Sequence, residues 1–153
     1  MKTLILGLGN PLLGDDGVGW RVADQLRTRV ADSGAEVDCL AGGGLSLMER
    51  LAGYDRAVIV DALATGQAAV GTVGCFDLEQ LPDPVAGHLS SAHETSLKTA
   101  LRLGASLGIS LPAEVKVVAI EAQQVYDFSE ALSPAVAAAV PVAVQRIVDL
   151  GWW

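Results

Sequence analysis

The chain has 153 residues, of which 51% are hydrophobic and 5% aromatic, and it carries 18 acidic against 10 basic residues. This length suits one core of ordinary size, so we expect a single domain over residues 1–153. The net charge of -8, without any run of Lys and Arg, argues against a nucleic-acid partner, because such binding depends on neutralising phosphates.

Cysteine content and hydropathy indicate the compartment. Cys39 and Cys75 lie in apolar segments without CxxC spacing, which is typical of reduced core cysteines. The apolar stretch 134–148 contains Pro141 and is too short to span a bilayer, and glycines interrupt the apolar start of the chain too early for a signal peptide. We therefore expect a cytoplasmic protein without membrane insertion.

Strand and helix patterns alternate along most of the sequence. Short apolar runs predict strands at 3–8, 36–40, 56–62, 71–77 and 114–120, and amphipathic or capped segments predict helices at 17–30, 46–52, 94–107 and 134–150. A loop rich in Pro and Gly covers 81–91. This order predicts an α/β fold in which a mostly parallel sheet has helices on both faces.

The first strand leads into the stretch "LGLGNPLLGDDGVGW", residues 6–20, which begins like a phosphate-binding loop. The spacing of Gly7, Gly9 and Gly14 does not match the dinucleotide fingerprint, and Pro11 removes a backbone donor. Asp15 and Asp16 would repel a pyrophosphate at the start of the following helix. The acidic pair favours a cation over an anion at this position.

Two aspartates are expected to meet where the parallel strands end, because that edge gathers the ligand-binding loops of an open α/β sheet, and His93 would join them if the loop before its helix lies at the same edge. Asp16 follows the first strand and Asp61 closes the apolar run "AVIVD". His93 lies in a capping-box pattern, where the helix dipole keeps an imidazole neutral and able to bind a metal. Two carboxylates and one imidazole would leave coordination positions open.

Each of these residues also has a purely structural interpretation. Asp15 or Asp16 would serve well as the N-cap of the first helix. Asp61 would bond to loop amides at a strand end, and His93 would be a solvated residue of a first helical turn.

Three segments together resemble one known family. "GLGNPLLGDDGVGWRV", "VIVDA" and "SAHETSL", in this order, resemble the hydrogenase maturation proteases, endopeptidases that trim the C-terminal extension from the large-subunit precursor of nickel-iron hydrogenases. The resemblance implies a three-layer αβα fold around a twisted sheet of about five strands. It also implies that Asp16, Asp61 and His93 are the catalytic and metal-contacting positions.

The same resemblance implies the partner and the metal. The partner would be an immature hydrogenase large subunit, whose own nickel is recognised, so no stably bound cofactor is expected. Either the metal activates a water, or a carboxylate acts as general base beside a metal used for recognition. Asp15, Gly42 and Gly43 are weaker candidates that would shape the cleft.

Departures from the family pattern leave the particular hydrogenase open. The family often has Asp before the Gly-Gly that follows the second strand, and this chain has Ala41 there. After the last strand, this chain reads Ile120-Glu121-Ala122-Gln123, which also differs from the common family sequence. Two other functions are alternatives. One is a non-catalytic nickel-binding scaffold; the other is a peptidyl-tRNA hydrolase, which "LILGLGNP" also resembles but which the acidic charge disfavours.

Overall fold

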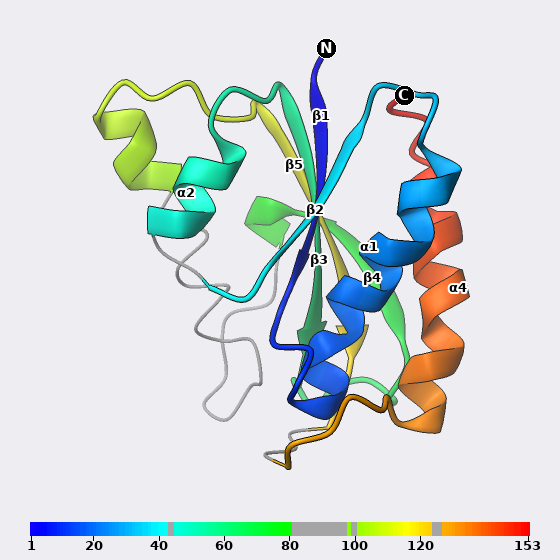
Figure 1. Ribbon diagram of the computed structural model, residues 1–153. Helices are drawn as coiled ribbons and strands as arrows, with labels where there is room; N and C mark the ends of the chain where they lie inside the picture. Colours follow the sequence, from blue (N-terminus) through cyan, green and yellow to red (C-terminus); the bar gives the residue numbers. More distant parts are fainter. Residues whose placement is uncertain (43–44, 81–97, 99–100, 124–126) are drawn as a thin grey trace.

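The computed structural model describes residues 1–42, 45–80, 98, 101–123 and 127–153 (Figure 1). Its elements, in chain order, are β1 (Thr3–Leu8), η1 (Gly14–Gly17), α1 (Val18–Arg29), β2 (Glu36–Leu40), α2 (Leu45–Leu51), β3 (Arg56–Leu63), β4 (Val73–Asp77), η2 (Leu78–Gln80), β5 (Glu114–Glu121) and α4 (Pro134–Val148). Residues 101–106 are also helical.

The strands form one sheet in the order β2-β1-β3-β5-β4. β2, β1, β3 and β5 are parallel, and β4 pairs antiparallel with β5 at one edge. The parallel strands end toward the bottom of Figure 1, where η1 and the segment before α4 also lie. The α/β fold with a mostly parallel sheet of five strands is therefore confirmed, and the bottom edge is where a ligand is expected.

Helices cover both faces of this sheet. α1 and α4 pack over one face, around buried residues such as Ile5, Val22 and Val144. α2 packs over the other face, around Leu4 and Leu51. Side chains of β1 point alternately to the two faces, so this strand contributes to both cores.

The start of α1 lies very close to the sheet. A Cβ on Gly7 would overlap the carbonyl oxygen of Gly19, and a Cβ on Gly19 would overlap the carbonyl oxygens of Val60 and Leu8. Only glycine at these two positions permits this backbone contact. It fixes the N-terminal end of α1, and η1 before it, against the ends of β1 and β3.

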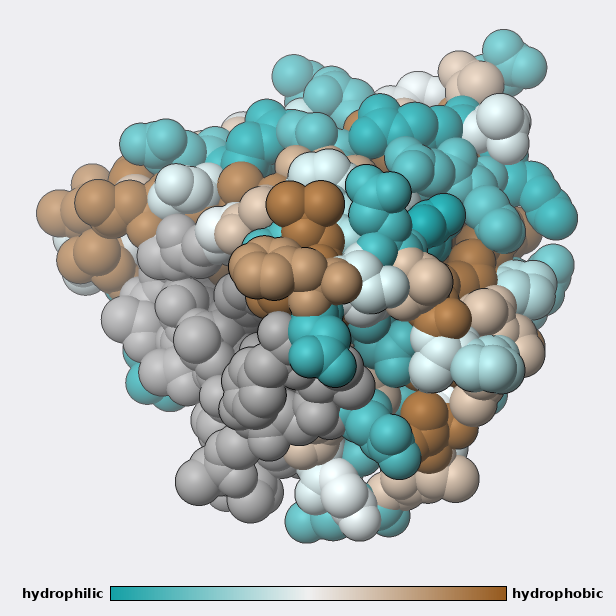
Figure 2. Space-filling model, turned by 60° about the horizontal axis from the view of Figure 1, so that its bottom comes forward, coloured by the Kyte–Doolittle hydropathy of each residue, from teal (hydrophilic) through white to brown (hydrophobic). Residues whose placement is uncertain are grey.

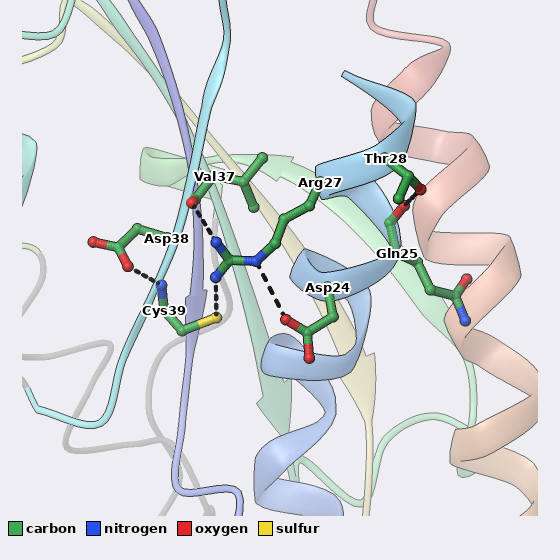
Figure 3. A network of polar contacts seen from close by, with 7 residues as sticks. All are labelled: Asp24, Gln25, Arg27, Thr28, Val37, Asp38 and Cys39. Carbon is green, nitrogen blue, oxygen red and sulfur yellow. Dashed lines mark hydrogen bonds and ion pairs between the residues drawn. The ribbon is translucent and has the colours of Figure 1, made fainter. Parts of the chain in front are cut away.

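A polar network connects α1 to the edge strand β2 (Figure 3). The Arg27 guanidinium donates to Asp24 Oδ1 at 3.3 Å, to the carbonyl oxygen of Val37 at 3.2 Å and to Cys39 Sγ at 3.7 Å. Burial raises the pKa of the Cys39 thiol, and the hydrogen bond from Arg27 lowers it by less, so the thiol is protonated at neutral pH. Both Cys39 and Cys75 are free and half-buried, so they are less buried than core cysteines.

The boundaries agree closely with the sequence predictions, with small corrections. A turn of 3-10 helix, η1, precedes α1; β4 begins at Val73 where the prediction began at residue 71, and α4 ends at Val148, not at residue 150. The predicted loop 81–91 and the start of the helix predicted at 94–107 lie outside the described residues. Within the part of the chain that the structure describes, no helix is both long enough and apolar enough to cross a membrane.

Candidate functional site

Buried acidic residues gather at the carboxyl edge of the sheet. Within the described ranges the buried acidic residues are Asp15, Asp16, Asp61 and Glu121, each between 3% and 6% exposed. Asp15 and Asp16 lie in η1 after β1, and Asp61 and Glu121 lie in the last residues of β3 and β5. Burying a carboxylate is costly unless it is paired or hydrogen-bonded, so the partners of each one indicate its role.

Asp16 has one satisfied and one unsatisfied oxygen. Its Oδ2 accepts a hydrogen bond from the backbone N–H of Asn10 at 2.8 Å. Its Oδ1 is buried and has no hydrogen-bond partner among the described residues. The backbone of Asp16 can lie this close to β1 because Gly9 adopts φ +124°, and a Cβ there would overlap the Asp16 carbonyl oxygen.

Asp15, next to it, has a structural role. Its Oδ1 accepts from the backbone N–H of Ser133 and its Oδ2 accepts from the Ser133 hydroxyl, both at 2.7 Å. Ser133 is the N-cap of α4, so Asp15 attaches the start of α4 to η1. The alternative in which Asp15 or Asp16 caps α1 is wrong, because the N-cap of α1 is Gly17 and it receives no side-chain cap.

Asp61 lies inside β3, two residues before the strand ends. Its Oδ1 accepts a hydrogen bond from the backbone N–H of Ala62 at 2.8 Å, and Asp61 takes part in a further interaction. β1 pairs with β3 through Gly7 and Val60, and η1 packs against β3. Asp16 and Asp61 therefore belong to contacting elements at the same edge, as the sequence predicts.

The third expected ligand cannot be placed. His93 lies outside the described residues, as do His88 and Gly43. Among the described residues, no group of three His, Cys, Asp or Glu side chains is arranged to hold a metal ion. The site made of Asp16, Asp61 and His93 thus stays a prediction.

Glu121 is a residue that the sequence analysis missed. Its Oε1 accepts from the backbone N–H of Thr65 at 2.9 Å, from the Thr65 hydroxyl at 2.7 Å and from the backbone N–H of Gly66 at 2.9 Å. The carboxylate of β5 thereby fixes the loop that follows β3. The signal that identified Asp61, an acidic residue closing an apolar strand, also applies to Glu121.

Comparison with known proteins relates this arrangement to one family. Residues 20–150 match the hydrogenase maturation protease family. The hydrogenase expression/formation protein HupD of Thiocapsa roseopersicina is 28% identical over 150 residues, which cover 97% of this chain and 66% of HupD. This chain thus spans about two thirds of the length of that relative.

Solved structures with the same fold are similar along the whole chain. The [NiFe] hydrogenase maturation protease HybD from Thermococcus kodakarensis superimposes with a TM-score of 0.73 and 29% identity, covering 98% of this chain and 99% of HybD. The hydrogenase maturating endopeptidase HybD from E. coli gives a TM-score of 0.80 at 24% identity, covering 98% and 91%. The latter similarity is evidence for the fold alone.

Proposed function

Since the chain belongs to the hydrogenase maturation protease family, we propose that it is an endopeptidase that removes the C-terminal extension of a [NiFe] hydrogenase large-subunit precursor. The precursor would be loaded with nickel, and that nickel would be part of the substrate. The immature large subunit is thus the partner, and no stably bound cofactor of the enzyme is required.

The Asp16 carboxylate supports this proposal most directly. Its Oδ1 is buried without a partner in the part of the chain that the structure describes, at the edge of the sheet where Asp61 also lies. A buried oxygen with a negative charge and no donor is unfavourable in the isolated protein, and a cation brought by another molecule would remove that cost. Asp16, Asp61 and His93 would bind the nickel of the precursor and so place the scissile peptide beside the carboxylates.

Positioning would account for much of the catalysis. Holding the peptide bond and a water molecule in a fixed arrangement replaces an encounter in solution by a reaction within one complex. The water would then be activated by the substrate's nickel, or by a carboxylate acting as general base. We also place the enzyme in the cytoplasm, since free Cys39 and Cys75 suit a reducing compartment.

Incubation of the purified protein with nickel-loaded and nickel-free precursor, followed by intact-mass measurement, tests the proposal. We expect the loaded precursor to lose a C-terminal peptide while the nickel-free precursor keeps its mass. Binding of the loaded precursor without any cleavage would instead identify a non-catalytic scaffold. Equal cleavage of both forms would contradict recognition through nickel.

A further inference from the structure

Two large apolar side chains are exposed beside the candidate site. Leu12, in the loop between β1 and η1, is 51% exposed, and Phe128, in the segment before α4, is 84% exposed. Figure 2 brings this edge of the molecule forward, and hydrophobic surface is visible near the middle of the view among hydrophilic residues. Single exposed apolar residues are common on protein surfaces, whereas exposed apolar residues that gather in one place often mark an interaction surface.

The backbone holds these two residues side by side. Leu13 and Ser129 form a parallel bridge, in which the N–H of Ser129 donates to the Leu12 carbonyl at 2.8 Å and the N–H of Gly14 donates to the Ser129 carbonyl at 2.7 Å. Because the N–H of Ser129 bonds to the Leu12 carbonyl, the backbones of Leu12 and Phe128 lie next to each other. Two exposed apolar side chains thus lie on neighbouring backbone segments, and together they are called the apolar patch.

Hydrogen bonds connect this patch to the Asp16 carboxylate. Asp16 Oδ2 accepts from the N–H of Asn10 at 2.8 Å, and the side-chain Oδ1 of Asn10 accepts from the N–H of Leu12 at 2.9 Å. Asp15 adds a second connection, because it binds Ser133 at the end of the segment that carries Phe128. The backbone that carries the patch is thus fixed relative to the Asp16 carboxylate.

Charges around the patch restrict the chemistry of what binds there. Asp127 and Glu130 are exposed on either side of Phe128. The Arg21 guanidinium donates to the backbone carbonyl of Glu130 at 2.7 Å and not to a carboxylate. Within the described segments, the side chains of Asp127 and Glu130 have no ion-pair partner. An apolar side chain with a basic neighbour suits this surface better than an acidic segment does.

We propose that Leu12 and Phe128 are the docking surface for an apolar segment of the precursor, flanked by a basic residue and adjacent to the bond that is cut. This inference rests on the proposed function. Docking beside Asp16 would hold the scissile peptide near the carboxylates, and the binding energy would come from apolar surface removed from water.

Kinetics of precursor processing test the docking surface. In the complex, each of these side chains would be buried against the precursor, and Ser would remove most of that apolar contact. We therefore expect Leu12→Ser or Phe128→Ser to raise KM about tenfold. We expect kcat to stay within about twofold, because neither side chain touches the reacting atoms. Phe128→Leu keeps an apolar group and should retain a KM near that of the wild type.

Leu107→Ser is the matched control, since Leu107 is also apolar and 64% exposed but follows the helical residues 101–106, away from η1. A KM for the Leu12→Ser/Phe128→Ser double variant that equals the wild-type value would overturn the docking surface and leave the protease function intact. A wild-type protein that leaves the nickel-loaded precursor uncut would overturn both. If the wild type were a dimer in sedimentation and Phe128→Ser were a monomer with an unchanged KM, the patch would bind a second copy of this chain, and the proposal would be contradicted.

Discussion

At the carboxyl edge of the sheet, two adjacent aspartates accept hydrogen bonds from different parts of the chain. Both oxygens of Asp15 accept hydrogen bonds from Ser133, whereas Asp16 has one oxygen bonded to Asn10 and one buried oxygen that no described residue contacts through a hydrogen bond. Asp15 therefore contributes to stability, and Asp16 carries an electrostatic cost that a ligand would offset. The two residues should respond to substitution in opposite ways.

Replacing Asp16 by Asn keeps the shape of the side chain and removes its charge. We expect processing of the nickel-loaded precursor to fall by at least about a hundredfold, because a neutral amide is a poor ligand for a cation. The melting temperature should not fall by more than a few degrees, because an uncompensated buried charge is removed at the same time. Initial rates and thermal melts measure the two quantities.

Asp15→Ala provides the contrast. It leaves the Ser133 N–H and hydroxyl without their acceptor, which should lower the free energy of unfolding by about 1–3 kcal/mol. Asp24→Ala, at an exposed ion pair with Arg27, should change stability by less than about 1 kcal/mol. If Asp15→Ala left stability unchanged while Asp16→Asn unfolded the chain, the assignment of the two roles would be wrong.

The sequence identified these acidic residues but not the hydrogen bonds that each of them makes. The strand ends and the turn were readable from apolar runs and glycines, and so the position of Asp16 and Asp61 at one edge followed from the fold class. The partner of Asp15 could not be read, because Ser133 lies 118 residues away and no local pattern connects the two. Glu121 was missed although it closes an apolar strand as Asp61 does; only its three donors, in the loop after β3, could not be read from the sequence.

On the scale of elements, the packing of α1 against β1 and β3 determines where η1 lies. Because Gly19 contacts the backbones of both strands, the helix start is held at a distance that no side chain would allow. The amphipathic pattern predicted that α1 covers the sheet. It gave no distance, because helical periodicity identifies the buried face and not the separation of two backbones.

Gly19→Ala tests this contact. The new Cβ would overlap the carbonyl oxygens of Val60 and Leu8, so α1 must move, and we expect a loss of about 1–3 kcal/mol in the free energy of unfolding. Movement of α1 would also displace η1 and lower the processing rate. Gly42→Ala is the control, because a Cβ there meets no atom within 4 Å. Denaturant unfolding of both variants gives the comparison, and equal stability would contradict the tight contact.

On the scale of the molecule, one sheet joins two apolar cores. Leu4 and Leu6 of β1 point into the core beneath α2, while Ile5 between them points into the core beneath α1 and α4. The alternation of strands and helices predicted these layers, since a parallel sheet has to be covered on both faces. The antiparallel direction of β4 was not readable, because an apolar run of five residues has no direction of its own.

Because both cores share the same strands, they should unfold together. Leu51 in α2 is fully buried in the second core, and Leu51→Ala should lower the free energy of unfolding by about 2–5 kcal/mol, a fall of roughly 5–15 °C in melting temperature.

The tryptophans report on the other face: Trp152 and Trp153 pack against the first core, and Trp20 lies in α1. We therefore expect tryptophan fluorescence and far-UV circular dichroism to shift to the same lower midpoint in Leu51→Ala. Exposed Leu107→Ala should leave both midpoints within about 1 °C of the wild type. A fluorescence midpoint that stayed in place while the circular dichroism midpoint fell would mean that the two faces unfold separately, and the shared sheet would then not couple α2 to the helices beside the carboxylates.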